Sequence, residues 1–217
     1  MAGSVLPYVP LDPPLRTDGV QVGVVIASTP YWAFAFHAAE LLQGFMEKRA
    51  ARETGVREVR EVGLAYWSLP DRDRWGGRVF DALLSSAKTR HARGSSVPGG
   101  LGSETHVLLI QYVDGARAVL ALIPRVFDDK EFLLGAQYND GSQSISGLIL
   151  RGEPFDHFGY LVHALVELFT TGRAPVPGER ALLTTGVVLF GQQVRQSGRA
   201  VSPPTLAISY PTSRTRP

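Results

Sequence analysis

Residues 155–198 read FDHFGYLVHALVELFTTGRAPVPGERALLTTGVVLFGQQVRQSG, and they contain two helical patterns joined by a proline-rich turn. In the first pattern, apolar residues recur every three or four positions and so share one helix face: Phe158, Leu161, Val162, Leu165, Leu168 and Phe169. We expect this stripe to be buried. Asp156 fits the N-cap, and Gly172 followed by Pro175 is a stop signal, because glycine accepts the left-handed backbone that ends a helix.

The second pattern predicts a helix that begins near Gly178 and ends at Ser197 and Gly198. Its apolar positions keep helical spacing: Leu182, Leu183, Val187, Phe190 and Val194. Residues 184–186 have small side chains, so one side of this helix has little side-chain bulk and another segment of backbone can approach it there.

Two hairpins are predicted before these helices. Strands at residues 106–112 and 116–123 flank Asp114-Gly115, and strands at 131–138 and 143–150 flank Asn139-Asp140-Gly141. Asp-Gly favours the tight turns whose twist matches paired strands. The economical interpretation is four adjacent antiparallel strands.

The remaining elements complete an α+β fold. Residues 20–27, 58–66 and 205–210 predict further strands, and residues 34–49 and 79–87 predict helices. We therefore expect an open, mostly antiparallel sheet of about seven strands with helices packed on one face. Residues 1–19 are rich in proline and predict an extended arm, and residues 20–217 predict a single domain.

Composition excludes several classes of function. The 22 basic and 20 acidic residues are nearly balanced and interspersed, which argues against nucleic acid or an anionic membrane as partner. The chain has no cysteine, so thiolate catalysis and thiolate metal sites are excluded. The N-terminal residues lack the pattern of a signal peptide and no apolar run is long enough to cross a membrane, so we expect a cytoplasmic protein.

Residues 157–201 together with PPTLAISY at 203–210 resemble the C-terminal end of the Gfo/Idh/MocA oxidoreductases, the glucose-fructose oxidoreductase-like family. The matching features are a helix that ends in TGR before two prolines, a helix that opens with ER-LL-TTG, and a short closing strand after a proline. The resemblance implies the substrate-binding and oligomerising half of such an enzyme, an open, largely antiparallel sheet backed by helices. It covers the C-terminal part of the chain most clearly.

The resemblance also implies a catalytic role for His37. Family members commonly open the corresponding helix with Asp-x-Gly-x-His-x-x-Asp; aligned on His37, the first aspartate falls on Ala33, the glycine on Ala35 and the second acid on Glu40. Residues three apart share a helix face, so Glu40 could orient His37 and raise its pKa, as a general acid/base requires. The alternative is a histidine that packs beside Trp32 and Phe36 in a structural role.

Other polar and aromatic residues are candidates for substrate binding. His157, Tyr160 and His163 lie on the polar side of the first helical pattern, where they could line a pocket or form a solvated face. Arg125 follows a predicted strand end, and Trp32 offers a flat face of the kind that stacks on sugar rings. A zinc site would need His37 or His106 brought beside His163, and we predict no metal.

The sequence lacks the glycine-rich turn that a dinucleotide site requires between a strand and a helix, and it lacks the Glu-Lys-Pro segment that carries the family's catalytic lysine. The glycines at 99–102 precede a predicted strand instead. We therefore expect no bound cofactor, and an enzyme, if it is one, that is not a self-sufficient NAD(P)-dependent dehydrogenase.

Three functional hypotheses remain open. The first is a stand-alone domain that binds a sugar-like, polyhydroxylated molecule, either independent of cofactor or completed by a separate NAD(P)-binding subunit. The second is a non-catalytic assembly subunit that oligomerises through its sheet face with itself or a full-length relative. The third is a fragment of a longer protein. We expect a homo-oligomer that forms through the sheet face, because the predicted helices can cover only one face of the sheet.

Overall fold

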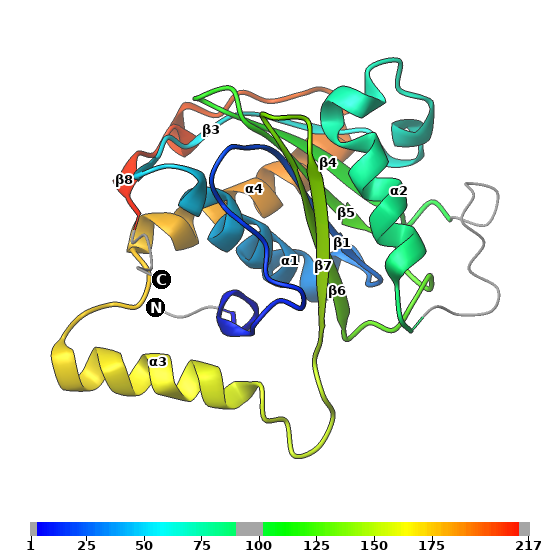
Figure 1. Ribbon diagram of the computed structural model, residues 1–217. Helices are drawn as coiled ribbons and strands as arrows, with labels where there is room; N and C mark the ends of the chain where they lie inside the picture. The colour runs from blue at the N-terminus through cyan, green and yellow to red at the C-terminus, as the bar shows by residue number, and fades with distance from the viewer. Residues whose placement is uncertain (1–3, 90–101, 213–217) are drawn as a thin grey trace.

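A six-stranded mixed sheet forms the centre of the chain, with the strands in the order β3-β4-β5-β1-β6-β7 (Figure 1). The structure, a computed structural model, describes residues 4–89 and 102–212. The strands of this sheet are β1 (Val20–Ala27), β3 (Val56–Glu61), β4 (His106–Tyr112), β5 (Arg117–Leu122), β6 (Glu131–Tyr138) and β7 (Gln143–Ile149). The α+β class is confirmed. The sheet is mixed because β1 runs parallel to β5, whereas its other pairs are antiparallel.

The two predicted hairpins, β4-β5 and β6-β7, are confirmed, and both turns contain a glycine with positive φ, Gly115 and Gly141. The four strands are not adjacent, however, because β1 lies between the hairpins and pairs with β5 on one side and β6 on the other. The sequence of β1, VQVGVVIA, explains this position: a nearly continuous apolar run suits a strand that is buried on both faces.

Two predicted strands are wrong in part. β3 ends at Glu61, and Gly63 adopts a positive φ of 47° that turns the chain into the 3-10 helix Gly63–Ser68. The predicted closing strand is reduced to β8 (Tyr210–Pro211), which pairs with β2 (Arg52–Glu53) in a separate two-stranded sheet. Prolines before it hold residues 204–206 in a 3-10 turn. The described residues thus contain eight strands rather than about seven.

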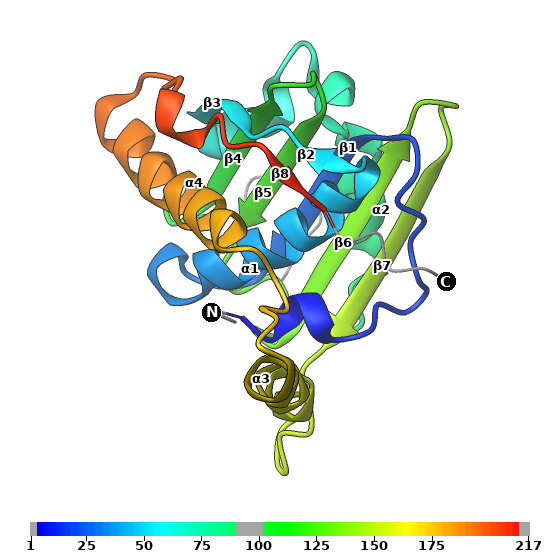
Figure 2. The same ribbon diagram turned by 90° about the vertical axis from the view of Figure 1, so that its left-hand side faces the viewer.

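Helices cover both faces of the sheet, so the prediction of helices on one face is wrong (Figure 2). On one face lie α1 (Tyr31–Met46), followed by the 3-10 turn Glu47–Arg49, and α4 (Gly178–Ser197). On the other lies α2 (Gly77–Ser86), with the 3-10 turn Arg72–Trp75. The side chains of β1 alternate accordingly, with Val25 and Ala27 toward α1 and Val24 and Ile26 toward α2.

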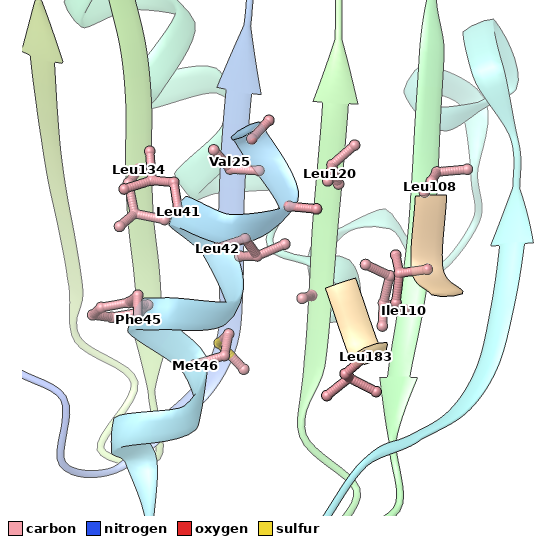
Figure 3. Packing of buried hydrophobic residues seen from close by; sticks show 14 of the residues in the cluster. Val25, Leu41, Leu42, Phe45, Met46, Leu108, Ile110, Leu120, Leu134 and Leu183 are labelled. Atoms are coloured by element: carbon pink, nitrogen blue, oxygen red, sulfur yellow. The ribbon is translucent and has the colours of Figure 1, made fainter. Parts of the chain in front are cut away.

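The core between α1, α4 and the sheet is built from large aliphatic side chains (Figure 3). From α1, Leu41, Leu42 and Met46 lie over the strands, and the sheet contributes Val25, Leu108, Ile110, Leu120 and Leu134. Burial of one such leucine or isoleucine side chain contributes about 1.5–3 kcal/mol. This core fixes α1, and with it the position of His37.

α3 (Phe158–Thr171) projects from the rest of the chain, and its apolar stripe is only partly buried (Figure 1). Leu161 packs against the core and Ala164 is buried. The other side of the helix is exposed: the exposed fraction is 51% at Phe158, 56% at Val162 and 84% at Phe169 in the stripe, and 52% at Val166 beside it. The expectation that this stripe is buried is therefore wrong for the single chain.

The ends of α3 and α4 match the stop signals in the sequence. Gly172 and Gly198 cap the two helices in the left-handed conformation, at φ 69° and 68°. The start of α3 differs, because the capping position is His157 rather than Asp156. No helix in the described ranges is long and apolar enough to cross a membrane.

The N-terminal arm lies along the edge strand β7 (Figure 2). After a short 3-10 turn at Leu6–Tyr8, the backbone N–H of Asp12 donates to the carbonyl of Gly147 at 3.1 Å. Arg16 then reaches Asp140 in the β6-β7 turn at 2.6 Å. The arm therefore covers an edge that would otherwise present unpaired backbone groups.

Candidate functional site

A cavity of about 250 Å³ opens where the N-terminal arm, α1, the ends of β6 and β7, and the segment before α3 meet. Its wall is mainly apolar, and it includes Leu6, Phe34, Phe132, Leu150, Phe155 and Phe158. Two imidazoles, those of His37 and His157, are part of this wall. Asp129, Lys130 and Arg151 add charged groups to the lining. We call this cavity the histidine pocket.

The segment before α3 is bent so that three side chains of the pocket wall come together: Phe155, His157 and Phe158. Phe155 has a positive φ of 59°, which is unusual for a residue other than glycine. Its N–H donates to the carbonyl of Gly152 at 2.7 Å, and its own carbonyl accepts from the N–H of Phe158 at 3.0 Å. The ring of Phe158 then lies 4.5 Å from the ring of His157, centroid to centroid.

His37 lies on α1 with its ring half-buried among aromatic neighbours. Its Nδ1 lies 2.9 Å from Ser4 Oγ, so the N-terminal arm orients the ring. The ring of Phe34 is 5.6 Å away. Burial lowers the pKa of His37, and the negative charge of Glu40 offsets this only in part. The imidazole is therefore neutral at neutral pH, and the expectation of a raised pKa is wrong because desolvation outweighs the carboxylate.

His157 offers an unpaired polar atom. Its Nδ1 is buried and has no hydrogen-bond partner among the residues that the structure describes. A buried polar atom without a partner costs about 1–3 kcal/mol, so such atoms in native proteins usually meet water or a ligand. Because His157 is part of the pocket wall, this nitrogen is a candidate contact for a molecule bound there.

Glu40 is not a partner of His37. Its carboxylate accepts a 2.5 Å hydrogen bond from Thr184 Oγ1, and its other oxygen lies 3.5 Å from Arg180 Nε. Both Glu40 and Arg180 are buried between α1 and α4. The two sequence candidates for catalysis therefore face different surroundings: His37 the pocket, and Glu40 the contact between the helices.

The other candidates lie outside the pocket lining. Trp32 is 87% exposed on the first turn of α1. Arg125 has a positive φ of 69° and pairs with Glu104 at 2.7 Å. Tyr160 and His163 are exposed on α3. Of the five predicted binding residues, the structure thus brings only His157 to His37.

Sequence reasoning missed several residues of the pocket wall. The sequence predicts a buried stripe that includes Phe158, and it predicts no contact for Phe155 or for Ser4 in the arm. Lys130 directly precedes β6 and Arg151 follows β7 at the open end of the same hairpin, and this shared position is the signal that the sequence offers. Most of the glycine cluster at 99–102 lies outside the described residues.

A second, larger cleft of about 620 Å³ lies between the arm, α2 and β7. Arg151 lines both this cleft and the histidine pocket. The other polar residues of the larger cleft include Asp12, Lys88 and Glu131. Glu131 is already satisfied by the backbone N–H groups of Lys88 and Thr89, at 2.8 and 2.9 Å. Within residues 4–89 and 102–212, no three histidine or acidic side chains are placed to hold a metal ion.

No protein-family model matches the sequence, and no curated protein matches it. Among solved structures, GenD2 from gentamicin A biosynthesis, solved in complex with NAD, has a TM-score of 0.52 and 13% identity, and the match covers 85% of this chain and 55% of that one. This likeness shows a shared fold. The chain spans about 55% of the length of GenD2.

Two further structures are similar at lower scores. The WlbA dehydrogenase from Bordetella pertussis, solved with NADH and UDP-GlcNAcA, has a TM-score of 0.49 and 12% identity over 87% of this chain and 57% of that one. Scyllo-inositol dehydrogenase from Lactobacillus casei, solved with NAD(H) and scyllo-inositol, has a TM-score of 0.48 and 13% identity, and the match covers 84% of this chain and 56% of that one. Both of these proteins are dehydrogenases.

Proposed function

We propose that this chain is the C-terminal, substrate-binding half of an oxidoreductase of the Gfo/Idh/MocA type, and that the histidine pocket binds a sugar-like, polyhydroxylated molecule. The observation that carries the proposal is the buried, unpaired Nδ1 of His157 in the same apolar pocket as His37. The fold shared with GenD2 supports the assignment to this type of enzyme.

The pocket chemistry suits a single sugar-like ring. A pyranose or cyclitol ring has a C–H face that packs on aromatic walls, here those of Phe34, Phe155 and Phe158. Its hydroxyl groups can bond the polar side chains of the lining, which include His37, His157, Lys130 and Arg151. A volume of about 250 Å³ lies below the roughly 300–1,000 Å³ of pockets for drug-sized ligands, which favours one ring over a dinucleotide.

His37 is the residue that we assign to proton transfer. Because burial lowers its pKa, the ring is neutral at neutral pH and can accept a proton from a ligand hydroxyl. The Ser4 hydroxyl bonds Nδ1, which leaves Nε2 for the ligand. In this scheme Glu40 acts on His37 only through its charge, and its main role is the packing of α1 against α4.

We infer that any redox cofactor is supplied by a separate NAD(P)-binding subunit, unless the chain acts without one. This rests on the missing glycine-rich turn and on the match to about 55% of GenD2. The isolated chain is expected not to bind NAD or NADP in calorimetry. Micromolar binding of either cofactor would overturn this part of the proposal.

The ligand proposal is tested by NMR titration of the purified chain with myo-inositol and with methyl β-D-glucoside, following the ring protons of the histidines. We expect shifts at His37 and His157 but not at His163, which is exposed on α3. His157→Phe should weaken the titration at least tenfold, whereas Tyr160→Phe, on the exposed side of α3, should not change it. Equal shifts at all three histidines, or none, would refute the assignment of the pocket.

The second candidate function, a non-catalytic assembly subunit, is favoured by the exposed apolar side chains on α3 and on α4, where Leu182 and Leu189 are 59% and 60% exposed. Assembly through the sheet face was expected because the predicted helices leave one face of the sheet uncovered, but α2 covers that face. Oligomerisation with itself or a full-length relative therefore needs another surface.

A further inference from the structure

We infer that Arg60, Arg74 and Arg117 form a binding site for a phosphate group on the α2 face of the sheet. We call these three residues the arginine cluster. The site is separate from the histidine pocket and independent of the molecule bound there. Free phosphate and the phosphoryl group of a larger molecule offer it the same chemistry.

Strand register places two of the three arginines on one face of the sheet. Arg60 on β3 lies opposite Leu109 of β4. Arg117, the first residue of β5, lies opposite Val22 of β1. Directly paired residues share a face of the sheet, and Leu109 and Val22 belong to the core beneath α2. Both arginines therefore lie on the α2 face.

The 3-10 turn Arg72–Trp75 brings the third arginine to the same place. The turn lies against β5, and Trp75 is buried in the core beneath α2. The guanidinium carbon of Arg60 lies 5.8 Å from the centre of the Trp75 ring. Burial lowers the pKa of Arg117, and the nearby charge of Arg74 lowers it further. Guanidinium groups from three separate elements thus gather around one turn.

The arginine cluster has no counter-ion among residues 4–89 and 102–212, where none of its side chains forms an ion pair or a hydrogen bond. The Nε atoms of Arg60 and Arg117 are buried, so the protein leaves these guanidinium groups unsatisfied. Like charges that lie close together repel, and charges removed from water are normally paired. The cluster therefore lacks an anion.

The acids of the same turn and of α2 are engaged elsewhere. Asp73 pairs with Arg78 at 3.2 Å, and Asp81 pairs with Arg72 at 2.5 Å. These two carboxylates balance two other arginines, so they are not available to the cluster.

Two carboxylates reduce the positive charge of the site without cancelling it. Asp71 accepts a 3.2 Å hydrogen bond from Trp75 Nε1, and its charge offsets part of the lowering of the Arg117 pKa. Glu58 lies on the same sheet face, opposite Gln111, and forms no ion pair with the described residues. Three positive charges against two negative ones leave an excess that attracts one anion.

The directions of approach favour phosphate over carboxylate. A carboxylate has two oxygens in one plane and is satisfied by one guanidinium fork, whereas several forks can share the tetrahedral oxygens of phosphate. The cluster donates from β3, from β5 and from the turn before α2. A phosphate group bound there would cancel their repulsion and hold that turn on the sheet.

The arginine cluster is too far from the histidine pocket to bind the same small molecule. Phe132, at the start of β6, is part of the pocket wall on the α1 face. Val22, the partner of Arg117, pairs on its other side with Gln137 near the end of β6. Residues 132 and 137 are roughly 17 Å apart along the strand. The two sites therefore lie at opposite ends of the sheet and on opposite faces.

Thermal unfolding of the full chain tests the site, with phosphate replacing chloride at constant ionic strength. At about pH 7.5 a phosphate group carries nearly two negative charges. The unfolding midpoint should rise by about 3–6 °C when phosphate is at ten times its dissociation constant, which we expect near ~1 millimolar. Arg117→Gln should abolish the rise, and Arg173→Gln, at an exposed position after α3, should preserve it.

The same variant is informative without phosphate. Arg117→Gln removes a charge that Arg74 repels, so in chloride it should unfold at the temperature of the wild type or above it. A clearly lower midpoint in chloride would mean that the Arg117 side chain has a structural partner in the protein, and it would overturn the site.

Asp71→Asn should have the opposite effect on binding. It removes a negative charge near Arg117, and its amide oxygen can still accept from Trp75 Nε1. Phosphate should then bind about two- to fivefold more tightly. In NMR spectra of the wild type, phosphate should shift the Nε–H signals of Arg60 and Arg117, and not that of Arg49, which is already paired.

Two further probes identify the source of the phosphate group. Tighter binding of glycerol 2-phosphate than of inorganic phosphate would assign the site to the phosphoryl group of a larger molecule, and the reverse order would assign it to the free ion. Acetate that binds as tightly as phosphate would overturn the choice of phosphate. A wild-type midpoint that phosphate leaves unchanged, or an equal rise in Arg117→Gln, would overturn the site itself.

Discussion

Thr184 Oγ1 on α4 donates a 2.5 Å hydrogen bond to Glu40 on α1, and this contact removes Glu40 from the site of His37. Arg180 joins the same cluster, 3.5 Å from Glu40 and 3.0 Å from Glu47. All these groups are buried, so the cluster holds the two helices that cover one face of the sheet.

Glu40→Ala is expected to lower the free energy of unfolding by about 3 kcal/mol, because it removes a buried partner of Arg180, and Glu47 compensates only in part. Glu40→Gln should cost less, since its amide oxygen can still accept from Thr184. Urea unfolding of both variants measures this order. Unchanged stability together with weaker ligand titration at His37 would instead return Glu40 to a catalytic role.

The stability of the protein should fall as the pH drops below about 6.5, the ordinary pKa of histidine. Burial lowers the pKa of His37 in the folded chain, so as the pH falls the unfolded chain takes up the proton first and becomes more populated. The contribution of His37 to the free energy of unfolding is therefore complete only at a pH above the pKa of histidine in the unfolded chain. Urea midpoints for wild type and His37→Asn, measured at about pH 7.5 and about pH 5.5, check this. His163→Asn, at an exposed position, is the control, and an equal pH dependence in wild type and His37→Asn would contradict the assignment.

Gly172→Ala should destabilise the end of α3 by about 1–2 kcal/mol, because φ is 69° there and a side chain is strained in that conformation. The Cβ itself would meet no neighbour. Gly159→Ala in the same helix is also free of neighbours and lacks the positive φ, so it should stabilise α3 by up to about 1 kcal/mol. Hydrogen exchange of the α3 amides reports both changes; effects of the same sign would contradict the backbone argument.

Gly186 on α4 is expected to tolerate no side chain while Leu206 is present. A Cβ at Gly186 would overlap the Leu206 side chain, which is fully buried. Overpacking of this kind costs about 1–3 kcal/mol. In the double variant Gly186→Ala with Leu206→Ala, part of that cost should vanish. The changes in the free energy of unfolding of the two single variants, measured in urea, should therefore not add up to that of the double variant. Additive costs would mean that the chain relaxes elsewhere.

Local patterns predicted most elements of the fold. The Asp-Gly turns identified both hairpins, the glycines at 172 and 198 marked two helix ends, and the thin side of α4 at Gly186 is where the segment carrying Leu206 approaches. These features depend on a few consecutive residues. The insertion of β1 between the hairpins and the position of α2 on the second face depend on contacts between distant segments, which periodicity does not encode.

The candidate site was less predictable for the same reason. His37 and His157 were both identified, but nothing in the sequence indicates that residues 120 positions apart share a wall. Helical spacing correctly placed Glu40 near the face of His37, yet Thr184 and Arg180, from another helix, provide its actual partners.

The central place of β1 also bears on how the chain reaches its fold. β1 emerges from the ribosome before either hairpin exists, and both of its neighbours, β5 and β6, lie about a hundred residues later in the sequence. Pairings between distant segments form slowly. Until then the run VQVGVVIA is an unpaired strand with high β-propensity and no charge, the kind of segment that aggregates. The amides of β1 should therefore be the last to become protected in pulse-labelling hydrogen exchange.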